Sequence, residues 1–310
     1  MNNMRVLRFH GSADAPQWTF GEAPVPQPRK GQLLIRVHAA GVTPTERRWY
    51  PTTHTISGAP RVGAIPGHEF SGEIAAVGEG IETRHVGRAV FGLNDWFAEG
   101  ATAGYCLTVP SSVTAKPARL THAEAASVPI GALTAWQGLF DRLALRAGER
   151  LLIHGGAGAV GVFAVQLARR AGATVVATAS ARNLAFVAEL GAHEVIDYKA
   201  ERFEERVGKV DAVFDAVGGE TLRRSWDVLA PGGRLVTVAA DAEDTAEPRV
   251  KEVFFIVESN ATQLQQIRLL LDHGDLRCCV NAAVPWSQAA GAYRGDIAPS
   301  RGKTVVTLEP

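Results

Sequence analysis

The sequence has few cysteines and lacks any long run of apolar residues. Its three cysteines, Cys106, Cys278 and Cys279, do not have the spacing of a zinc motif or a disulfide framework, so free thiols in a reducing compartment are expected. No stretch approaches about 18 uninterrupted apolar residues, the length that a membrane span needs. The opening residues, MNNMRVLRFHG, have no apolar core like that of a secretory signal. These absences predict a soluble, cytoplasmic protein with no membrane partner.

The sequence also lacks an excess of charge of either sign. Lys and Arg together number 32, Asp and Glu together also number 32, and no run of five or six like charges occurs. A nucleic-acid partner is therefore not expected. The expected partner is a small-molecule substrate. With 310 residues, 46% of them apolar and 21% charged, the chain has the composition of a globular enzyme and the length of two domains.

The pattern of apolar runs changes twice along the chain. Up to about residue 120, short β-type runs alternate with turn residues, and Thr121 with Glu124 then has the spacing of a helix capping box. From there, continuous apolar strands alternate with helical patterns, which is typical of a parallel sheet covered on both faces. The segment VKEVFFIVESN is expected to form one more strand, and the last stretch returns to β-type runs. The pattern predicts a mostly-β domain from residues 1–122 and 275–310, with an α/β domain of residues 123–274 inserted.

One glycine cluster stands directly between a strand pattern and a helix pattern, in LLIHGGAGAVGVFAVQLARRAG. Gly156, Gly158 and Gly161 match G-x-G-x-x-G in the context that makes this pattern informative for dinucleotide binding. The first glycine is expected to permit the tight turn, the second to let the backbone approach a pyrophosphate, and the third to let the helix pack closely. A turn that merely links strand and helix is the alternative.

The end of the following strand indicates which dinucleotide binds. An NAD site usually has an Asp or Glu there, about 20 residues after the glycines. The sequence instead reads ATASARN, in which Ser180 and Arg182 offer hydrogen-bond donors to a 2′-phosphate. NADP(H) is therefore favoured over NAD(H). The alternative role for Arg182 is that of an exposed charge in the first turn of a helix, where arginine is common.

The order of several short motifs resembles that of a known family. The motifs GVTP, PGHEFSGEIAAVG, LTAWQGLF, HGGAGAVGVFAVQLA, FDAVGG, LAPGGRLV, FFIVESN and RGK occur in order over nearly the whole chain. They resemble those of the zinc-independent quinone oxidoreductase type of the medium-chain dehydrogenase/reductase family. The resemblance implies a GroES-like catalytic domain, an inserted Rossmann domain, an active site in the cleft and a homodimer.

The resemblance also implies a set of cofactor-binding residues. Strand packing is the alternative role for Tyr198, Phe255 and Val257. The implied contacts are Tyr198 beside the adenosine, Ser180 and Arg182 at the 2′-phosphate, Gly158, Ala159 and Val160 at the pyrophosphate, Thr134, Val217, Gly218 and Ala239 towards the nicotinamide and its ribose, Phe255 and Val257 as its wall, and Lys303 approaching from the other domain.

No metal is predicted at the catalytic site. His68 in GHE resembles a zinc ligand of the alcohol dehydrogenase branch, but catalytic zinc needs three protein ligands. The positions where that branch has cysteines are Thr43 and about Ile130 here, and the four clustered cysteines of a structural zinc lobe are missing. His68 and Glu69 are interpreted instead as a hydrogen-bonded pair.

The sequence therefore predicts an NADPH-dependent, zinc-independent reductase that transfers hydride to a quinone or to the C=C of an α,β-unsaturated carbonyl. Without zinc, a side chain or solvent must supply the proton or hydrogen bond at the oxygen. Tyr50 is the candidate donor, although packing on Pro51 is as consistent with the sequence; Thr43, Thr45 and Asn94 are candidates for orienting the substrate. A zinc-dependent alcohol dehydrogenase and a non-catalytic NADPH-binding redox sensor are the alternatives.

Overall fold

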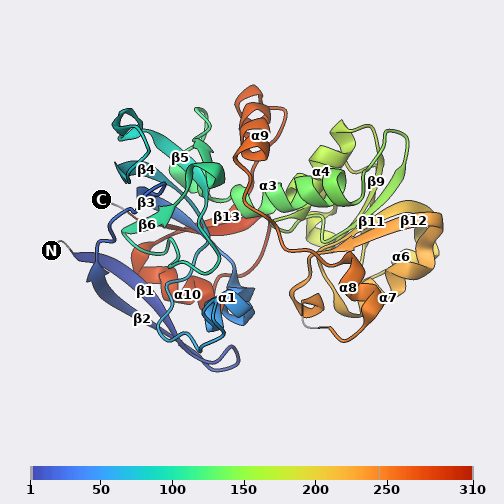
Figure 1. Cartoon of the computed structure of the whole chain (residues 1–310). Coiled ribbons are helices and arrows are strands. Elements are labelled where there is room, and N and C mark those ends of the chain that lie inside the picture. The colour runs from blue at the N-terminus through green and yellow to red at the C-terminus, as the bar shows by residue number, and fades with distance from the viewer. Residues whose placement is uncertain (1–2, 244, 309–310) are drawn as a thin grey trace. The chain divides into compact units, whose positions relative to one another are not determined.

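The computed structural model describes residues 3–243 and 245–308, which form two compact units (Figure 1). The first unit comprises Met1–Ile130, Ser259–Pro299 and Lys303–Pro310, and the second comprises Gly131–Glu258 and Ser300–Gly302. None of the helices in the described ranges is both long and apolar enough to cross a bilayer.

A seven-stranded sheet forms the centre of the first unit. Six strands follow the order β13-β14-β3-β4-β5-β7, and β6 also pairs with β3. β13 and β14, from the end of the chain, reach the sheet because β14 pairs antiparallel with β3, so the last stretch folds back on the first domain as predicted. The strands are β3 (Leu33–Val42), β4 (Glu69–Val77), β5 (Ala89–Leu93), β6 (Tyr105–Thr108), β7 (Val113–Ala115), β13 (Val280–Pro285) and β14 (Lys303–Thr307).

The rest of the first unit packs around this sheet. β1 and β2 form an antiparallel pair, and Leu7 of β1 joins the core cluster that includes Ile35 and Phe70 of the sheet. The remaining elements are β1 (Asn3–Gly11), β2 (Pro16–Pro24), α1 (Tyr50–Thr53), α2 (His122–Ala126), α9 (Ala261–His273) and α10 (Ala289–Arg294). The predicted capping box at the start of α2 is present, with Thr121 and Glu124 each bonding the other's backbone.

The second unit is built on five parallel strands in the order β10-β9-β8-β11-β12. Each strand contributes an apolar residue to one core cluster, namely Leu152, Val176, Ile196, Val213 and Leu235. The order reverses between β8 and β11, and ligands of such sheets bind outside the carboxyl ends at that point. The elements are α3 (Pro129–Trp136), which begins at the joint, β8 (Arg150–His154), α4 (Gly161–Arg170), β9 (Thr174–Ala179), α5 (Leu184–Glu189), β10 (Glu194–Asp197), α6 (Phe203–Arg206), β11 (Val210–Asp215), α7 (Gly219–Ser225), β12 (Leu229–Thr237) and α8 (Pro248–Val253).

The joints between the units differ from the predicted boundaries at 122/123 and 274/275. α2 belongs to the first unit because Ala126 packs with Ala39 of β3 and Val305 of β14. α9 also belongs to the first unit, where Gln265 accepts a hydrogen bond from Thr114 at 2.7 Å. Both helices look like parts of the α/β pattern in sequence, and only their tertiary packing assigns them.

One expected strand is largely absent. In VKEVFFIVESN the first residues continue α8, which begins at Pro248, and Phe254 then makes a single parallel bridge to Thr237. Proline is favoured in the first helical turn because its missing N–H has no helical partner there. The apolar run therefore extends the sheet beyond β12 by one isolated pair instead of a full strand.

Candidate functional site

The glycine cluster forms the turn from β8 into α4 at the point where the strand order reverses. Gly156 was expected to permit the tight turn, but the residue with the left-handed conformation is Gly155, with φ of 81°. Gly156 has a packing role: a Cβ there would lie 3.0 Å from Val187 Cγ1 and 3.1 Å from the Cβ of Ala177. The turn therefore depends on a glycine just outside the G-x-G-x-x-G pattern.

The other two glycines have the predicted geometry. A Cβ on Gly161 would lie 2.1 Å from the carbonyl oxygen of Gly155, so this position lets the start of α4 approach the turn closely. A Cβ on Gly158 would meet only that same oxygen, at 3.3 Å, and otherwise open space. The backbone at Gly158 is therefore accessible to a ligand, which is what a pyrophosphate requires.

The start of α4 presents backbone donors beside this open position. In the described part of the chain, the amides of Ala159 and Val160 donate to no other group, whereas that of Gly158 donates to Gly155. Unpaired amides at the start of a helix attract anions. The residues of this loop therefore fit a dinucleotide pyrophosphate.

The neighbouring strand brings a second loop to the same place. A Cβ on Gly155 would lie 3.4 Å from Val217 Cγ2, so the loop after β11 adjoins the glycine turn. Asp215 holds this loop because its buried carboxylate accepts the amides of Val217, at 3.1 Å, and Gly218, at 3.2 and 3.1 Å, together with the Thr237 hydroxyl at 2.7 Å. Burial raises the pKa of Asp215, although these hydrogen bonds oppose the rise.

The other residues expected along the nicotinamide half vary in exposure. Ala239, Phe255, Val257 and Thr134 are buried, whereas Val217 is half exposed. Ala239 donates its amide to Thr237 Oγ1 at 3.2 Å, and Phe255 donates its amide to the Thr237 carbonyl at 3.3 Å. These backbone bonds hold both positions next to the end of β12.

The end of β9 gathers polar groups from two distant parts of the sequence. Ser180 Oγ accepts a hydrogen bond from Asn183 at 3.4 Å, and Asn183 in turn accepts one from Arg301 Nε at 3.1 Å. The Arg301 guanidinium also lies over the Phe186 ring, 4.5 Å from its centroid. Arg182 is exposed on the same turn, and sequence reasoning did not find Arg301 because it lies in the short return segment Ser300–Gly302.

Two further features border this region. Tyr198 follows β10, is 55% exposed, and donates its amide to the Ala179 carbonyl at the end of β9. The return segment also lies along the glycine loop, where Gly302 donates its amide to the Ala157 carbonyl at 2.9 Å and pairs with Gly158. The second unit therefore completes the surroundings of its glycine loop with residues from the end of the chain.

In the first unit, Lys303 forms a buried cluster with two of the residues singled out from the sequence. Its Nζ atom forms an ion pair with Glu69 and donates to Thr43 Oγ1 at 3.0 Å. The other Glu69 oxygen accepts the amide of Ile130 at 2.9 Å. The Lys303 ammonium is thus held inside its own unit by a carboxylate and a hydroxyl.

His68 does not pair with Glu69, which corrects the predicted pair. The side chains of neighbouring residues alternate across a strand, and Glu69 begins β4. His68 Nδ1 lies 3.2 Å from Asn94 Oδ1, and His68 Nε2 lies 3.4 Å from Glu46 Oε1. Asn94 also donates to the Glu99 carbonyl at 2.8 Å, so both polar atoms of its side chain are engaged.

Burial keeps the His68 and Glu46 side chains neutral near pH 7. It lowers the pKa of His68 to about 4, with Arg61 adding to the effect, and raises the pKa of Glu46 to about 8. The amide of Gly67 donates to Glu46 at 2.8 Å, which opposes the rise without cancelling it. Glu46 was not found from the sequence, where nothing distinguishes it from a surface carboxylate.

Thr45 and Tyr50 are exposed, in contrast to this buried cluster. Tyr50 begins the short helix α1 and does not lie in a loop as expected. Its ring stacks on His54, with centroids 4.5 Å apart and an interplanar angle of 8°, and its edge approaches Phe97. The phenol is therefore positioned by aromatic neighbours, and the ring is 48% exposed.

Comparisons with known proteins agree with this geometry. Residues 29–137 match the model of an alcohol dehydrogenase GroES-like domain, and residues 190–306 match that of a zinc-binding dehydrogenase. A protein of Arthroderma benhamiae named "Probable zinc-binding oxidoreductase, mitochondrial" is 31% identical over 312 residues, covering 94% of this chain and 93% of that protein. The chain belongs to the medium-chain dehydrogenase/reductase family.

Two other similar proteins are named for reductase or oxidoreductase activities. The 2-methylene-furan-3-one reductase of Solanum lycopersicum is 32% identical over 289 residues, covering 90% of this chain and 71% of that protein. The solved structure of the quinone oxidoreductase from Coxiella burnetii has a TM-score of 0.88 and 30% identity, covering 99% of this chain and all of that one. The predicted GroES-like and Rossmann architecture is confirmed, and the chain is a quinone oxidoreductase-like oxidoreductase.

The GroES-like unit also contains one group suited to a metal, in a place that the sequence did not suggest. In the described ranges, one set of three His, Cys, Asp or Glu side chains brings its ligand atoms together, and it consists of His38, Glu73 and His122. His68, the histidine that resembles a zinc ligand of the alcohol dehydrogenase branch, is not in this set.

The Rossmann unit contains a second residue that sequence reasoning missed. His154 ends β8 directly before the glycine turn and is fully buried. Its Nδ1 lies 3.2 Å from Thr178 Oγ1, and its Nε2 lies 3.0 Å from Ser225 Oγ, which donates to the Thr221 carbonyl at 2.7 Å. Burial, with Arg224 adding to it, lowers the pKa of His154 to about 3, so this network holds a neutral imidazole.

Proposed function

We propose that this protein is an NADPH-dependent, zinc-independent reductase that transfers hydride to a quinone or to the C=C of an α,β-unsaturated carbonyl. The observation that carries the proposal is the accessible glycine backbone at Gly158, where the strand order of the sheet reverses. The quinone oxidoreductase and enone reductase names of the relatives support the acceptor class.

The residues of the Rossmann unit would hold the cofactor along its length. Gly158 with the amides of Ala159 and Val160 would bind the pyrophosphate, while Gly156 and Gly161 would let the turn and the start of α4 pack closely enough for this contact. Val217, Gly218 and Ala239 would border the nicotinamide and its ribose. Thr134, Phe255 and Val257 would form the apolar side of the nicotinamide pocket, and Tyr198 would flank the adenosine. When bound, the nicotinamide supplies a hydride.

The preference for NADPH rests on the end of β9. The sequence from Ala177 to Asn183 contains no carboxylate that would repel a 2′-phosphate. Ser180 and the Arg182 guanidinium offer donors there, and a guanidinium binds phosphate through a charge-assisted fork. These residues would bind NADPH in preference to NADH.

The residues of the GroES-like unit would handle the oxygen that gains charge. Thr43 Oγ1 accepts its hydrogen bond from Lys303, so its own hydroxyl proton is available to the substrate oxygen. Tyr50 would donate the proton, and Thr45 would help orient the acceptor. Asn94, which sequence reasoning placed beside the acceptor, would act only through His68 because both polar atoms of its side chain are engaged. The side chains at Thr43 and Ile130 are not zinc ligands, which supports a reaction without zinc at this site.

A parallel assay tests the proposal. Purified protein, before and after chelation, is given NADPH or NADH with a small quinone or a conjugated enone, and oxidised cofactor with a simple alcohol. The expected result is oxidation of NADPH that survives chelation and exceeds that of NADH. Tyr50→Phe is expected to lower kcat at least about 100-fold if the phenol is the proton donor.

Each alternative outcome identifies a different function. Alcohol oxidation that chelation abolishes would identify a zinc-dependent alcohol dehydrogenase, in keeping with the zinc-binding names among the family model and relatives. Tight binding of NADPH with no acceptor reduced would identify a redox sensor. An unchanged kcat in Tyr50→Phe would assign the proton to solvent.

The location and assembly form part of the same proposal. We expect a cytoplasmic homodimer, and the absence of a disulfide among Cys106, Cys278 and Cys279 in the described residues supports a reducing compartment. Light scattering of the purified protein tests the dimer, and fractionation of the source cells tests the location.

A further inference from the structure

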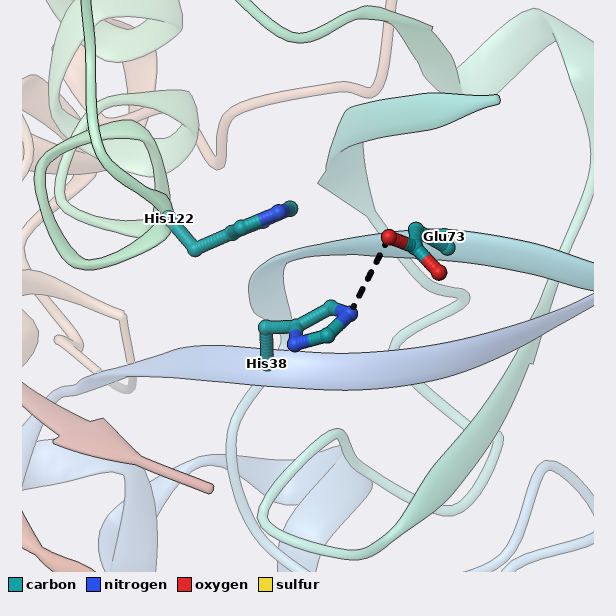
Figure 2. A group of neighbouring side chains, drawn as sticks. All are labelled: His38, Glu73 and His122. Carbon is teal, nitrogen blue, oxygen red and sulfur yellow. Dashed lines mark ion pairs between the residues drawn. The ribbon is translucent and has the colours of Figure 1, made fainter. Parts of the chain in front are cut away.

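Three side chains with metal-binding atoms meet beside the sheet of the GroES-like unit. His38 comes from β3, Glu73 from the neighbouring strand β4, and His122 from the first position of α2. One ligand atom from each lies within 4.8 Å of the other two. Figure 2 shows the two imidazoles directed towards the Glu73 carboxylate from these separate elements.

The Nε2 atom of His38 is shielded from solvent. It has no hydrogen-bond partner among the described residues, and Glu73 Oε1 lies 3.6 Å away. That distance is too long for a hydrogen bond. It is close to the separation of about 3.4 Å expected for two ligands on one tetrahedral zinc ion, since zinc lies about 2.0–2.2 Å from each nitrogen or oxygen.

Neighbouring residues direct the other two ligands. Arg36 donates to Glu73 Oε2 at 2.7 Å, which fixes the carboxylate with Oε1 towards His38. The Ser71 hydroxyl donates to the Val90 carbonyl at 3.2 Å and lies 2.8 Å from His122 Nδ1. Both Ser71 bonds form when Nδ1 carries the proton of a neutral imidazole, and the lone pair of His122 is then on Nε2.

The two imidazoles are also arranged side by side. Their rings stack with centroids 4.4 Å apart and an interplanar angle of 25°. Both rings are therefore close enough for one ion to reach a nitrogen of each, since the ligand atoms of the three side chains lie within 4.8 Å of one another. A set of two histidines and one carboxylate is a recognised zinc ligand set, and water can take the fourth position.

We propose that His38, Glu73 and His122 bind a zinc ion. The site joins β3, β4 and the start of α2, so the ion stabilises the GroES-like unit. None of its ligands belongs to the residues assigned to hydride transfer, and zinc content and catalysis are therefore separate properties of this protein.

Zinc titration of the full-length protein tests the proposal. Protein stripped with a chelator is titrated with zinc in competition with a chromophoric chelator, and its thermal unfolding is followed with and without zinc. The expected result is about one high-affinity ion per chain and a higher Tm with zinc. His122→Gln and Glu73→Gln are expected to weaken binding at least about 100-fold, and Ser71→Ala about 10- to 100-fold.

Two further variants test whether histidines outside this site bind the zinc ion. His273→Gln, which changes an exposed histidine at the end of α9, is expected to bind zinc like the unchanged protein. His68→Gln is also expected to keep its zinc. The zinc-free Tm of each variant reports whether it folds, and Ser71→Ala gives a test that keeps all three ligands.

Three results would overturn the proposal: no zinc bound by the unchanged protein, binding that is unaffected in both His122→Gln and Glu73→Gln, or binding lost in His68→Gln and retained in His122→Gln. The last result would transfer the ion to the position used by zinc-dependent relatives. NADPH oxidation by His122→Gln is measured in parallel, and it is expected to continue without the ion.

Discussion

Lys303 and Glu69 form a buried ion pair that joins β14, from the end of the chain, to the start of β4. Removing one partner leaves the other charge buried without compensation, which typically costs about 3–5 kcal/mol. We expect Lys303→Met to lower the free energy of unfolding by this amount, as measured by denaturant titration. The double variant Lys303→Met/Glu69→Gln is expected to lose less, because no unpaired charge remains.

The same variants test the role of Thr43. Without the Lys303 ammonium, the Thr43 hydroxyl no longer accepts a hydrogen bond from Lys303. We therefore expect kcat to fall even where the double variant remains folded. Equal stability of Lys303→Met and the unchanged protein would show that the ion pair contributes little. Unchanged kcat in the folded double variant would remove Thr43 and Lys303 from the proposed mechanism.

Gly158 and Gly161 offer a matched pair of substitutions in the glycine loop. A Cβ on Gly158 meets only the Gly155 carbonyl oxygen, at 3.3 Å, and otherwise open space. Gly158→Ala is therefore expected to fold with a free energy of unfolding within about 1 kcal/mol of the unchanged protein and to bind NADPH at least about tenfold more weakly. A Cβ on Gly161 would meet the Gly155 carbonyl, so Gly161→Ala is expected to lose about 1–3 kcal/mol of stability. Denaturant titration and NADPH fluorescence measure both effects. Undiminished NADPH affinity in Gly158→Ala would contradict a pyrophosphate at this position.

The features predicted correctly from the sequence are those encoded over short distances along the chain. The apolar run before Gly155, the spacing of the glycines and the Thr121–Glu124 capping box each depend on neighbouring residues. The identity of the turn residue was missed because Gly155 and Gly156 are adjacent, and only the backbone angles distinguish their roles.

The features that the sequence did not reveal depend on tertiary contacts. Arg301 bonds Asn183 although the two residues are 118 positions apart in the sequence. His38 meets His122 only because α2 packs on the sheet. In the same way, His68 lies against Asn94 and Glu46 and does not pair with its sequence neighbour Glu69. A pattern along the chain specifies which residue types are present, whereas the fold determines their partners.

The end of β9 gives a test of cofactor choice. Arg182→Leu is expected to raise KM for NADPH about 10- to 100-fold and to leave KM for NADH nearly unchanged, since a hydrogen bond to a charged group contributes about 1.5–3 kcal/mol. Arg301→Leu is expected to act in the same direction, because Arg301 fixes Asn183 on the turn that carries Arg182. Arg223→Leu, on the exposed side of α7, is the control. Equal losses with both cofactors would assign these arginines to folding instead of phosphate recognition.

The buried His154 makes stability depend on pH in a predictable direction. Its pKa is about 3 in the folded protein and about 6.5 in the unfolded chain, so between these values the unfolded state binds one more proton. Its contribution to stability is complete above about pH 6.5 and declines by about 1.4 kcal/mol per pH unit as pH falls towards 3. Glu46, with a raised pKa, acts in the opposite direction between about pH 8 and 4.5, so the comparison must be with a variant that lacks only the histidine. Denaturant titrations at pH 6, 5 and 4 measure how the free energy of unfolding falls as the pH falls. This fall is expected to be about 1.4 kcal/mol per pH unit less steep in His154→Asn than in the unchanged protein. Equal slopes in the two proteins would show that the imidazole is charged in the folded state.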